Sequence, residues 1–369
     1  MSALNAPIDV APAKDVFFLH DGQAFARRAI RYVAMDVRVA SHNLTQASPP
    51  GSVSAQVLVC CLNRLKATDL PAIRKLSSQF AAPPIILLAA QPRDARKLAK
   101  ELPDAVFMFE PLNLVTLKTT VRHALDQAVE AAWAKLQPQN REALKASLKS
   151  FQSCFAASAS GAPLPIDEVY GACRLVKDSF DGGNFGEWLS ALQMHHDRTY
   201  RHSMMVCGSL TYFCRELGVR SADLEMVSVG GFLHDIGMSR VPQEILDQQC
   251  KPGSADVEAL RRHPNHSRDI LLAETGLDPR ILDQAIQHHE FLDGTGFPDG
   301  LTGHQISDLV RLTTVVDTYA LLTEEKPYEL GMTPKKAFDM MVAYRGRLDQ
   351  ALVSRYQELV LDTAEAEAA

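Results

Sequence analysis

His234 and Asp235 stand side by side in the chain, and this pair constrains the possible folds more than any other feature. An apolar run precedes the pair, and Gly237 follows it after one further residue. Neighbouring residues on an α-helix differ by about 100° in direction, so both side chains can reach one cavity at a helix end. A single His-Asp pair is more often a surface pair or a local hydrogen bond, so the residues around it decide its meaning.

Histidines are concentrated on both sides of this pair. Nine of the twelve histidines lie between His195 and His304. Imidazoles and carboxylates suit two divalent cations better than they suit a thiolate-bound structural zinc. We therefore predict a functional metal site. The candidate ligands lie on separate segments of the chain: His202, His234, Asp235, His263, His288, His289 and Asp317. We leave the other histidines of this region on the surface or behind the ligands: His195, His196, His266 and His304.

Each candidate also has a simpler explanation. His202 can extend from its helix to solvent, and His263, which precedes a proline, can be a turn residue. Asp317 differs from these, because it lies in an apolar run and a carboxylate is costly to bury unless it is paired or bound to a metal. For Glu290 we predict a hydrogen bond to a ligand histidine rather than direct ligation.

The order of these residues resembles the HD-GYP family of metal-dependent cyclic-di-GMP phosphodiesterases. The resemblance covers residues 166 to 345, about half of the chain. The family motif HDIGK corresponds to the stretch from His234 to Met238. The motif HHExxDGxGYPxGL corresponds to the stretch from His288 to Leu301, with Phe297 in place of the tyrosine.

The resemblance implies a catalytic centre with two divalent transition-metal ions, and nitrogen and oxygen ligands favour iron or manganese. Two such ions can lower the pKa of a water molecule and hold phosphate oxygens during in-line attack. His234 and Asp235 would take part in catalysis, with Asp235 as the bridge. By the family's division of ligands, one ion would have His202, His234 and Asp317. The other ion would have His263, His288 and His289.

The resemblance also implies which residues meet the ligand and partner proteins. Cyclic-di-GMP would be the ligand, with Lys326 as a substrate-binding cation. The loop formed by Gly296, Phe297 and Pro298 would dock other signalling proteins.

Four further positions depart from the family pattern. Arg198 replaces a glutamate that helps some members to recruit a third ion, Met238 replaces a lysine, Ala320 an aspartate and Glu329 a phosphate-binding cation. Losing a cation that stabilises the transition state costs on the order of 10²–10³ in rate. The sequence therefore favours a slow cyclic-di-GMP phosphodiesterase with two ions. A catalytically silent cyclic-dinucleotide sensor or docking module, and a phosphohydrolase of another nucleotide phosphoester, stay open as alternatives.

The N-terminal part of the chain alternates apolar runs with helical stretches. The runs cover residues 15–20, 36–40, 56–61, 84–88 and 105–109. Continuous apolar strands that alternate with helices predict a doubly wound α/β domain, with a parallel sheet covered on both faces.

This layout resembles a response-regulator receiver domain. The resemblance implies an aspartate that accepts phosphate where Cys61 stands, a Ser or Thr where Ala89 and Ala90 follow the fourth run, and a lysine where Glu110 stands. Of the expected acidic pair only Asp21 is present. Phosphoryl transfer needs a nucleophile, a held magnesium ion and a cation. We therefore predict a pseudo-receiver that serves pairing or partner docking.

The chain is predicted to be multidomain. The expected parts are a flexible tail at 1–14, the pseudo-receiver at 15–128, a helical connector and linker at 129–165, and an all-α HD-GYP helical bundle at 166–363. Residues 115–148 are helical in pattern with a break near Pro138, and residues 156–165 are the expected linker. The connector can pack against a second copy, so we expect a homodimer.

Composition excludes several classes of protein. The chain is 46% hydrophobic and 22% charged, which is typical of a globular protein. A net charge of −6 argues against a nucleic acid polymer as partner. Uninterrupted apolar runs are too short for membrane insertion, which needs about 18 residues. Seven cysteines without a Cys-x-x-Cys motif indicate buried thiols in a reducing compartment, and we expect a cytoplasmic protein.

Overall fold

The computed structural model describes most of the chain, and two compact units divide it. The described residues are 14–22, 24–34, 37–43, 55–65, 69–80, 82, 84–88, 99–181, 185–195, 197–246, 254–324 and 331–368. The units are Met1–Ala132 and Trp133–Ala369. The predicted tail at 1–14 lies outside the described residues except for Lys14, which begins the first strand.

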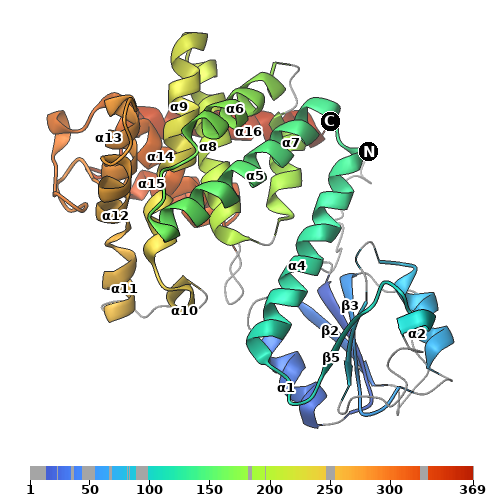
Figure 1. Ribbon diagram of the computed structural model, residues 1–369. Helices are drawn as coiled ribbons and strands as arrows, with labels where there is room; N and C mark the ends of the chain where they lie inside the picture. The colour runs from blue at the N-terminus through green and yellow to red at the C-terminus, as the bar shows by residue number, and fades with distance from the viewer. Residues whose placement is uncertain are drawn as a thin grey trace. The chain divides into compact units, whose positions relative to one another are not determined.

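A five-stranded parallel sheet forms the N-terminal unit, in the order β2-β1-β3-β4-β5 (Figure 1). Its strands are β1 (Lys14–His20), β2 (Val39–Asn43), β3 (Ala55–Leu62), β4 (Ile85–Leu88) and β5 (Val106–Phe109). Helices α1 (Ala24–Val33) and α4 (Leu114–Ala132) pack on one face, and α2 (Leu70–Ser77) packs on the other. Within β1, Val16 and Phe18 face α1, while Phe17 and Leu19 face α2. The predicted parallel sheet with apolar residues on both faces is confirmed.

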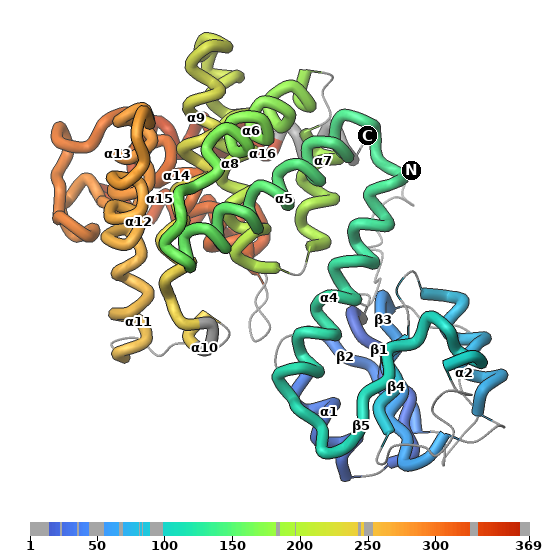
Figure 2. The backbone as a smooth tube through the Cα atoms, in the orientation of Figure 1, coloured from blue at the N-terminus to red at the C-terminus, as the bar shows by residue number. Residues whose placement is uncertain are grey.

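Helices form the second unit throughout its described residues (Figure 2). The longer ones are α5 (Pro138–Ser160), α6 (Ile166–Ser179), α8 (Arg198–Glu216), α9 (Ser221–Leu233), α14 (Asp308–Thr323), α15 (Pro334–Ala343) and α16 (Gln350–Ala368). The shorter ones are α7 (Phe185–Gln193), α10 (Gln243–Leu246), α11 (Ala255–Leu260), α12 (His263–Leu271), α13 (Pro279–Gln287), and the 3-10 segments η1 (Trp133–Lys135), η2 (Ile236–Arg240) and η3 (Gly303–Gln305). Helix α9 packs against α6, α8 and α13 and is buried along most of its length, as expected of a helix that is apolar all round.

Local sequence signals determine where the central helices begin and end. Asp197 caps α8 by accepting a hydrogen bond from the backbone N–H of Tyr200 at 3.0 Å. Ser307 caps α14 in the same way through the N–H of Val310. Such caps satisfy backbone donors that have no partner within the helix. Helix α8 ends at Glu216, just before Gly218, and the φ of 80° at Gly218 favours glycine.

The region between the predicted domains is helical and belongs to the second unit from Trp133 onward. The predicted break near Pro138 is confirmed, because α4 ends at Ala132 and α5 begins at Pro138, where proline is well tolerated. Helix α5 packs against α6 and η2 and continues to Ser160. The sequence predicts a linker at residues 156–165, but residues 156–160 belong to this helix. A homodimer through this region stays a prediction.

Two further expectations concern cysteines and membranes. The six cysteines within the described ranges are all buried with free thiols, in agreement with their expected role as small apolar residues. Among the helices of the described residues, none combines the length and the apolar character needed to cross a membrane.

Candidate metal centre

Seven predicted ligand residues come together inside the second unit. His202 lies on α8 and Asp317 on α14, while the other five lie at the ends of helices. His234 and Asp235 follow α9, His263 begins α12, and His288 and His289 follow α13. Six of the side chains are buried, and that of His289 is half-buried at 19% exposed. Three overlapping groups of these residues have their ligand atoms within 4.8 Å of one another: His263, His288 and His289; His202, His234 and Asp317; and His234, Asp235 and His288.

Asp235 lies between two pairs of histidines. Its Oδ2 atom is 3.6 Å from Nε2 of His202 and 3.5 Å from Nε2 of His234. Its Oδ1 atom is 3.1 Å from Nε2 of His263 and 3.5 Å from Nε2 of His288. One carboxylate therefore presents a different oxygen to each pair.

Asp317 closes the other side of the cluster. Its Oδ1 atom is 3.0 Å from Nε2 of His202 and 3.8 Å from Nε2 of His234. Its Oδ2 atom is 3.5 Å from Nδ1 of His289. The prediction that a carboxylate in this apolar helix has buried partners is thus met by three histidines.

Backbone carbonyls determine which ring nitrogens face the cluster. Nδ1 of His234 lies 2.8 Å from the carbonyl oxygen of Gly231, and Nδ1 of His263 lies 2.7 Å from that of Leu260. Nδ1 of His288 lies 3.2 Å from the carbonyl oxygen of Gln284. Because a carbonyl only accepts hydrogen bonds, each Nδ1 carries the proton and donates it. Each Nε2 atom is then left with a lone pair directed into the cluster.

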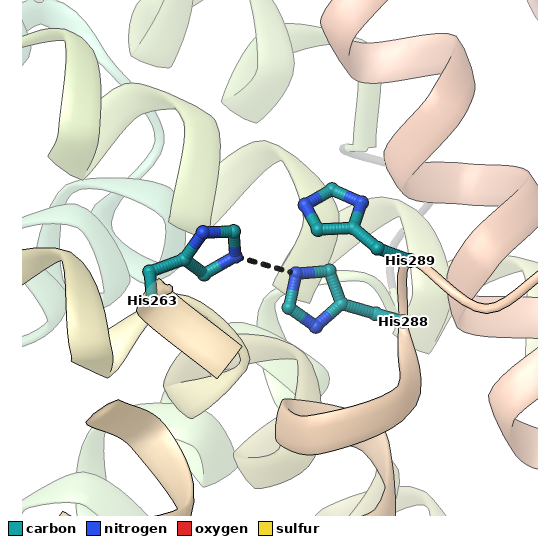
Figure 3. Close-up of side chains that lie close together, drawn as sticks. All are labelled: His263, His288 and His289. Carbon is teal, nitrogen blue, oxygen red and sulfur yellow. Dashed lines mark hydrogen bonds between the residues drawn. The ribbon is translucent and has the colours of Figure 1, made fainter. Parts of the chain in front are cut away.

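Lone pairs that converge in this way fit a cation. Nε2 of His263 lies 3.2 Å from Nε2 of His288, and His289 lies beside them (Figure 3). Nε2 of His234 lies 3.4 Å from Nε2 of His202 in the same cluster. Neutral imidazoles with facing lone pairs repel each other unless a proton or a metal ion lies between them. The residues present can therefore bind metal.

Burial and charge separate the pKa values of the cluster. Burial lowers the pKa of His234 to about 4 and holds that of His289 well below its ordinary value, so both rings stay neutral. Burial opposes charge on Asp235 and Asp317, but the surrounding histidines hold both carboxyl pKa values below their usual range. Burial would also lower the pKa of His202, but Asp317 outweighs it and raises this pKa to about 9. The carboxylates and the rings of His234 and His289 thus have the protonation states that metal ligation requires, whereas His202 must lose a proton before it can bind a metal ion.

Gly237 allows the segment after the His-Asp pair to lie against α12. A Cβ atom at this position would overlap the carbonyl oxygen of His263 and the backbone nitrogen of Ser267. The N–H of Gly237 donates to Oγ of Ser267 at 3.0 Å. This close contact brings Asp235 and His263 to one another, which explains the glycine in the motif.

Glu290 does not behave as predicted. The sequence predicts a hydrogen bond to a ligand histidine, whereas the buried carboxylate accepts backbone N–H groups from its own loop. Oε1 accepts from Asp299 at 2.6 Å and from Gly300 at 3.0 Å, and Oε2 accepts from Leu301 at 2.9 Å. The prediction is wrong because the backbone N–H groups of the loop residues 299–301 donate to the Glu290 carboxylate. This residue therefore holds the loop in place.

The loop of Gly296, Phe297 and Pro298 lies against the cluster. The ring of Phe297 lies 4.7 Å from the ring of His289, and the guanidinium of Arg261 lies 4.5 Å from the Phe297 ring centroid. The N–H of Phe297 donates to the carbonyl oxygen of His289 at 3.1 Å. Phe297 is therefore part of the wall of the site. Docking of signalling proteins by this loop stays a prediction.

The remaining predicted residues fall into three groups. Lys326, Glu329, His196, Ala89 and Ala90 lie outside the described residues. Met238 is half-buried in η2 and Ala320 is buried on α14. His195 is buried against Trp133 and Tyr200, while His266 is half-buried and His304 is exposed.

Two ion pairs beside the cluster were not predicted. Arg198 and Arg201 on α8 both contact Glu324, which directly follows α14, at 3.4 and 3.5 Å. The sequence contains no local signal for the contacts with Glu324, because Glu324 lies far from both arginines along the chain. The only sequence indication is that Arg198 precedes His202 by one helical turn.

Known proteins resemble this part of the chain. Residues 189–352 match the family model described as HD domain. A cyclic di-GMP phosphodiesterase of Pseudomonas aeruginosa is 32% identical over 172 residues, which cover 47% of this chain and 42% of that protein. A 3'3'-cGAMP-specific phosphodiesterase of Vibrio cholerae is 32% identical over 182 residues, which cover 49% of this chain and 37% of that protein. The matches therefore span less than half the length of either relative.

A solved structure matches over a longer stretch. The protein of Bdellovibrio bacteriovorus described as an HDG"Y"P protein is similar with a TM-score of 0.49 and 18% identity. The match covers 66% of this chain and 80% of that one.

Proposed function

We propose that the segment spanning residues 189–352, which matches the HD domain family model, acts as a metal-dependent phosphodiesterase on cyclic-di-GMP. The observation that carries the proposal is the position of Asp235, whose two oxygens face two different pairs of histidines. A carboxylate placed in this way is suited to bridge two cations, and two-cation sites are a common solution for phosphoester hydrolysis. The names of the two curated relatives support a cyclic dinucleotide as the substrate class.

Each of the seven residues has a role in the proposal. One cation would be held by His202, His234 and Asp317, the other by His263, His288 and His289, and both by Asp235. Two bound cations, with iron or manganese favoured by the ligand set, would lower the pKa of a water molecule and withdraw charge from the phosphate.

The protein itself would supply orientation and exclusion of water. The carbonyls that accept from Nδ1 of His234, His263 and His288 fix the rings with Nε2 turned inward. Burial of Asp235 and Asp317 keeps water from competing for their oxygens. Pre-positioned groups of this kind need little reorganisation when charge develops on the phosphate.

Turnover by the purified chain tests the proposal. Wild-type protein should hydrolyse cyclic-di-GMP, and the metal content should be measured on the same sample. The 3'3'-cGAMP substrate should be assayed in parallel, because one of the relatives is specific for it. Hydrolysis of 3'3'-cGAMP alone would move the assignment to that substrate. If the metal-loaded protein binds both dinucleotides without hydrolysing them, the protein is a sensor rather than an enzyme.

For the N-terminal unit we propose a pseudo-receiver that docks a partner protein. The order β2-β1-β3-β4-β5 is one of the common orders of doubly wound sheets, and its ligand crevice lies at the carboxyl ends of the strands. Near those ends, Cys61 is buried in β3, and Glu110 pairs with Arg28 at 2.8 Å. Neither residue supplies the aspartate or the lysine of a phosphorylated receiver.

An open hollow with basic residues favours docking over phosphorylation. It is lined by Ala24, Arg27, Arg28, Arg31 and Tyr32 of α1, together with Leu114. Three arginines on one helix favour an acidic segment of a partner protein. We also propose a cytoplasmic location, as expected from the sequence.

A further inference from the structure

Arg198 and Glu324 extend the contact between α8 and α14 beyond the candidate metal centre. His202 on α8 contacts Asp317 on α14 at 3.0 Å. Arg198 precedes His202 by four residues, and residues at this spacing lie on one face of a helix. Glu324 follows Asp317 by seven residues, which is two turns of helix. The ion pair of Arg198 and Glu324 therefore lies on the side of both helices that carries the metal ligands.

The guanidinium of Arg198 is held loosely. Its Nη2 atom is 3.4 Å from Oε2 of Glu324, longer than the about 2.7–2.9 Å of a strong charge-assisted hydrogen bond. Glu324 is shared with Arg201, which also donates to the carbonyl oxygen of His195 at 2.9 Å. Arg201 is thus fixed at two points, whereas Arg198 has, among the described residues, a single long contact with a shared carboxylate.

The described residues do not use every hydrogen-bond donor of Arg198. Its Nε atom is buried and has no hydrogen-bond partner among the described residues. Its side chain is nevertheless 32% exposed, while that of Glu324 is 8% exposed. A buried donor without a partner costs free energy that an incoming acceptor recovers. The Glu324 carboxylate therefore contacts the guanidinium of Arg198 on its buried side, and the accessible part of the Arg198 side chain can bind an anion.

We propose that Arg198 is a substrate-binding residue that donates to a non-bridging phosphate oxygen of the cyclic dinucleotide, and that Glu324 positions it. This inference rests on the proposed function. The planar guanidinium keeps its charge at all working pH values and matches phosphate oxygens with two parallel N–H groups. Met238 stands where the family resemblance implies a lysine, so a cation from α8 would take over part of the missing charge.

The test compares three variants of the full chain loaded with metal. Arg198→Gln removes the charge, Arg198→Lys keeps the charge but loses the planar fork, and Arg174→Gln is the matched control. Arg174 of α6 pairs with Glu225 of α9 at 2.8 Å and is not among the residues of the candidate metal centre. Three quantities are measured for each variant: metal content, the kinetic constants for cyclic-di-GMP, and the inhibition constant of inorganic phosphate.

Arg198→Gln should retain the metal content of wild type while KM for the dinucleotide and the inhibition constant of phosphate both rise. A rise of roughly 10- to 100-fold corresponds to the loss of a hydrogen bond to a charged group. Arg198→Lys should restore part of this loss, and Arg174→Gln should match wild type. Changes within about twofold in Arg198→Gln, or loss of metal from it, would overturn the inference, since the second result indicates a purely structural role.

The phosphate measurement separates this inference from the proposed function. If wild type does not hydrolyse cyclic-di-GMP, the proposed function fails. Phosphate binding by the metal-loaded protein that is lost in Arg198→Gln and retained in the control would still support Arg198 as a phosphate-binding residue. Equal phosphate binding by wild type and Arg198→Gln would contradict it in either case.

Discussion

Oδ1 of Asp235 lies 3.1 Å from Nε2 of His263, in the interior of a helical unit where an isolated charge would be costly. The other oxygen of the same carboxylate faces a second pair of histidines. This arrangement makes Asp235 the point at which two groups of ligands meet.

Metal binding by the metal-free protein should release protons. Burial would lower the pKa of His202, but its hydrogen bond to Asp317 outweighs burial and raises the pKa to about 9. His202 therefore carries a proton at neutral pH, and a cation can bind its Nε2 atom only when that proton leaves.

Calorimetric titration with manganese in buffers of different ionisation enthalpy measures this release. About one or more protons per chain should leave near neutral pH, and the number contributed by His202 should fall as the pH rises through about 9. A binding enthalpy that does not depend on the buffer would contradict the assignment of His202.

Phe297→Ala should weaken retention of metal. The ring of Phe297 lies 4.7 Å from the ring of His289, so its removal opens the wall of the site and lets that ligand move. Loss of a group that supports a ligand typically costs about 10- to 100-fold in metal affinity. Rates of metal loss to a chelator should show this increase in Phe297→Ala, while Phe297→Tyr should behave as wild type. Equal rates in all three proteins would exclude a supporting role for the ring.

Met238→Lys should raise the turnover rate. Met238 is half-buried in η2, three residues after Asp235, where the family resemblance implies a lysine. An added ammonium would stabilise negative charge as it develops on the transferring oxygens, so kcat should rise about tenfold or more with a smaller change in KM. Met238→Leu is the control for packing. An unchanged kcat in Met238→Lys would show that this position does not contact the reacting phosphate.

Residue types and spacing were sufficient to predict the helical framework and the residues that come together in the buried cluster, while metal ligation by these residues stays a prediction. Histidines and carboxylates are uncommon in the interior, so Asp317 within an apolar run was informative by itself. The partners of Glu290 could not be predicted, because they are backbone N–H groups presented by a loop whose path depends on tertiary packing. The pairing of Arg198 with Glu324 joins residues 126 positions apart, and no local pattern encodes such a contact.

The N-terminal unit should not accept phosphate. Cys61 is buried in β3 where the receiver resemblance implies an aspartate, and burial together with nearby Cys60 and Asp21 holds its thiol pKa well above the ordinary value. Incubation with acetyl phosphate and magnesium should therefore leave the chain unmodified and its oligomeric state unchanged. Mass spectrometry that locates a phosphorylated carboxylate within residues 15–128 would refute the pseudo-receiver.

The most direct test of the account is the metal content of wild type and of Asp235→Ala, purified in parallel under anaerobic conditions. Asp339→Ala is the control, since Asp339 is an exposed aspartate that pairs only with Lys335 at 2.9 Å in the described structure. Wild type and the control should each hold close to two transition-metal ions per chain, as the two-cation proposal requires. Asp235→Ala should keep its helical content, hold fewer than about one ion and lose activity, because the carboxylate would hold both ions. Two ions retained in folded Asp235→Ala, or none in folded wild type, would contradict the central claim.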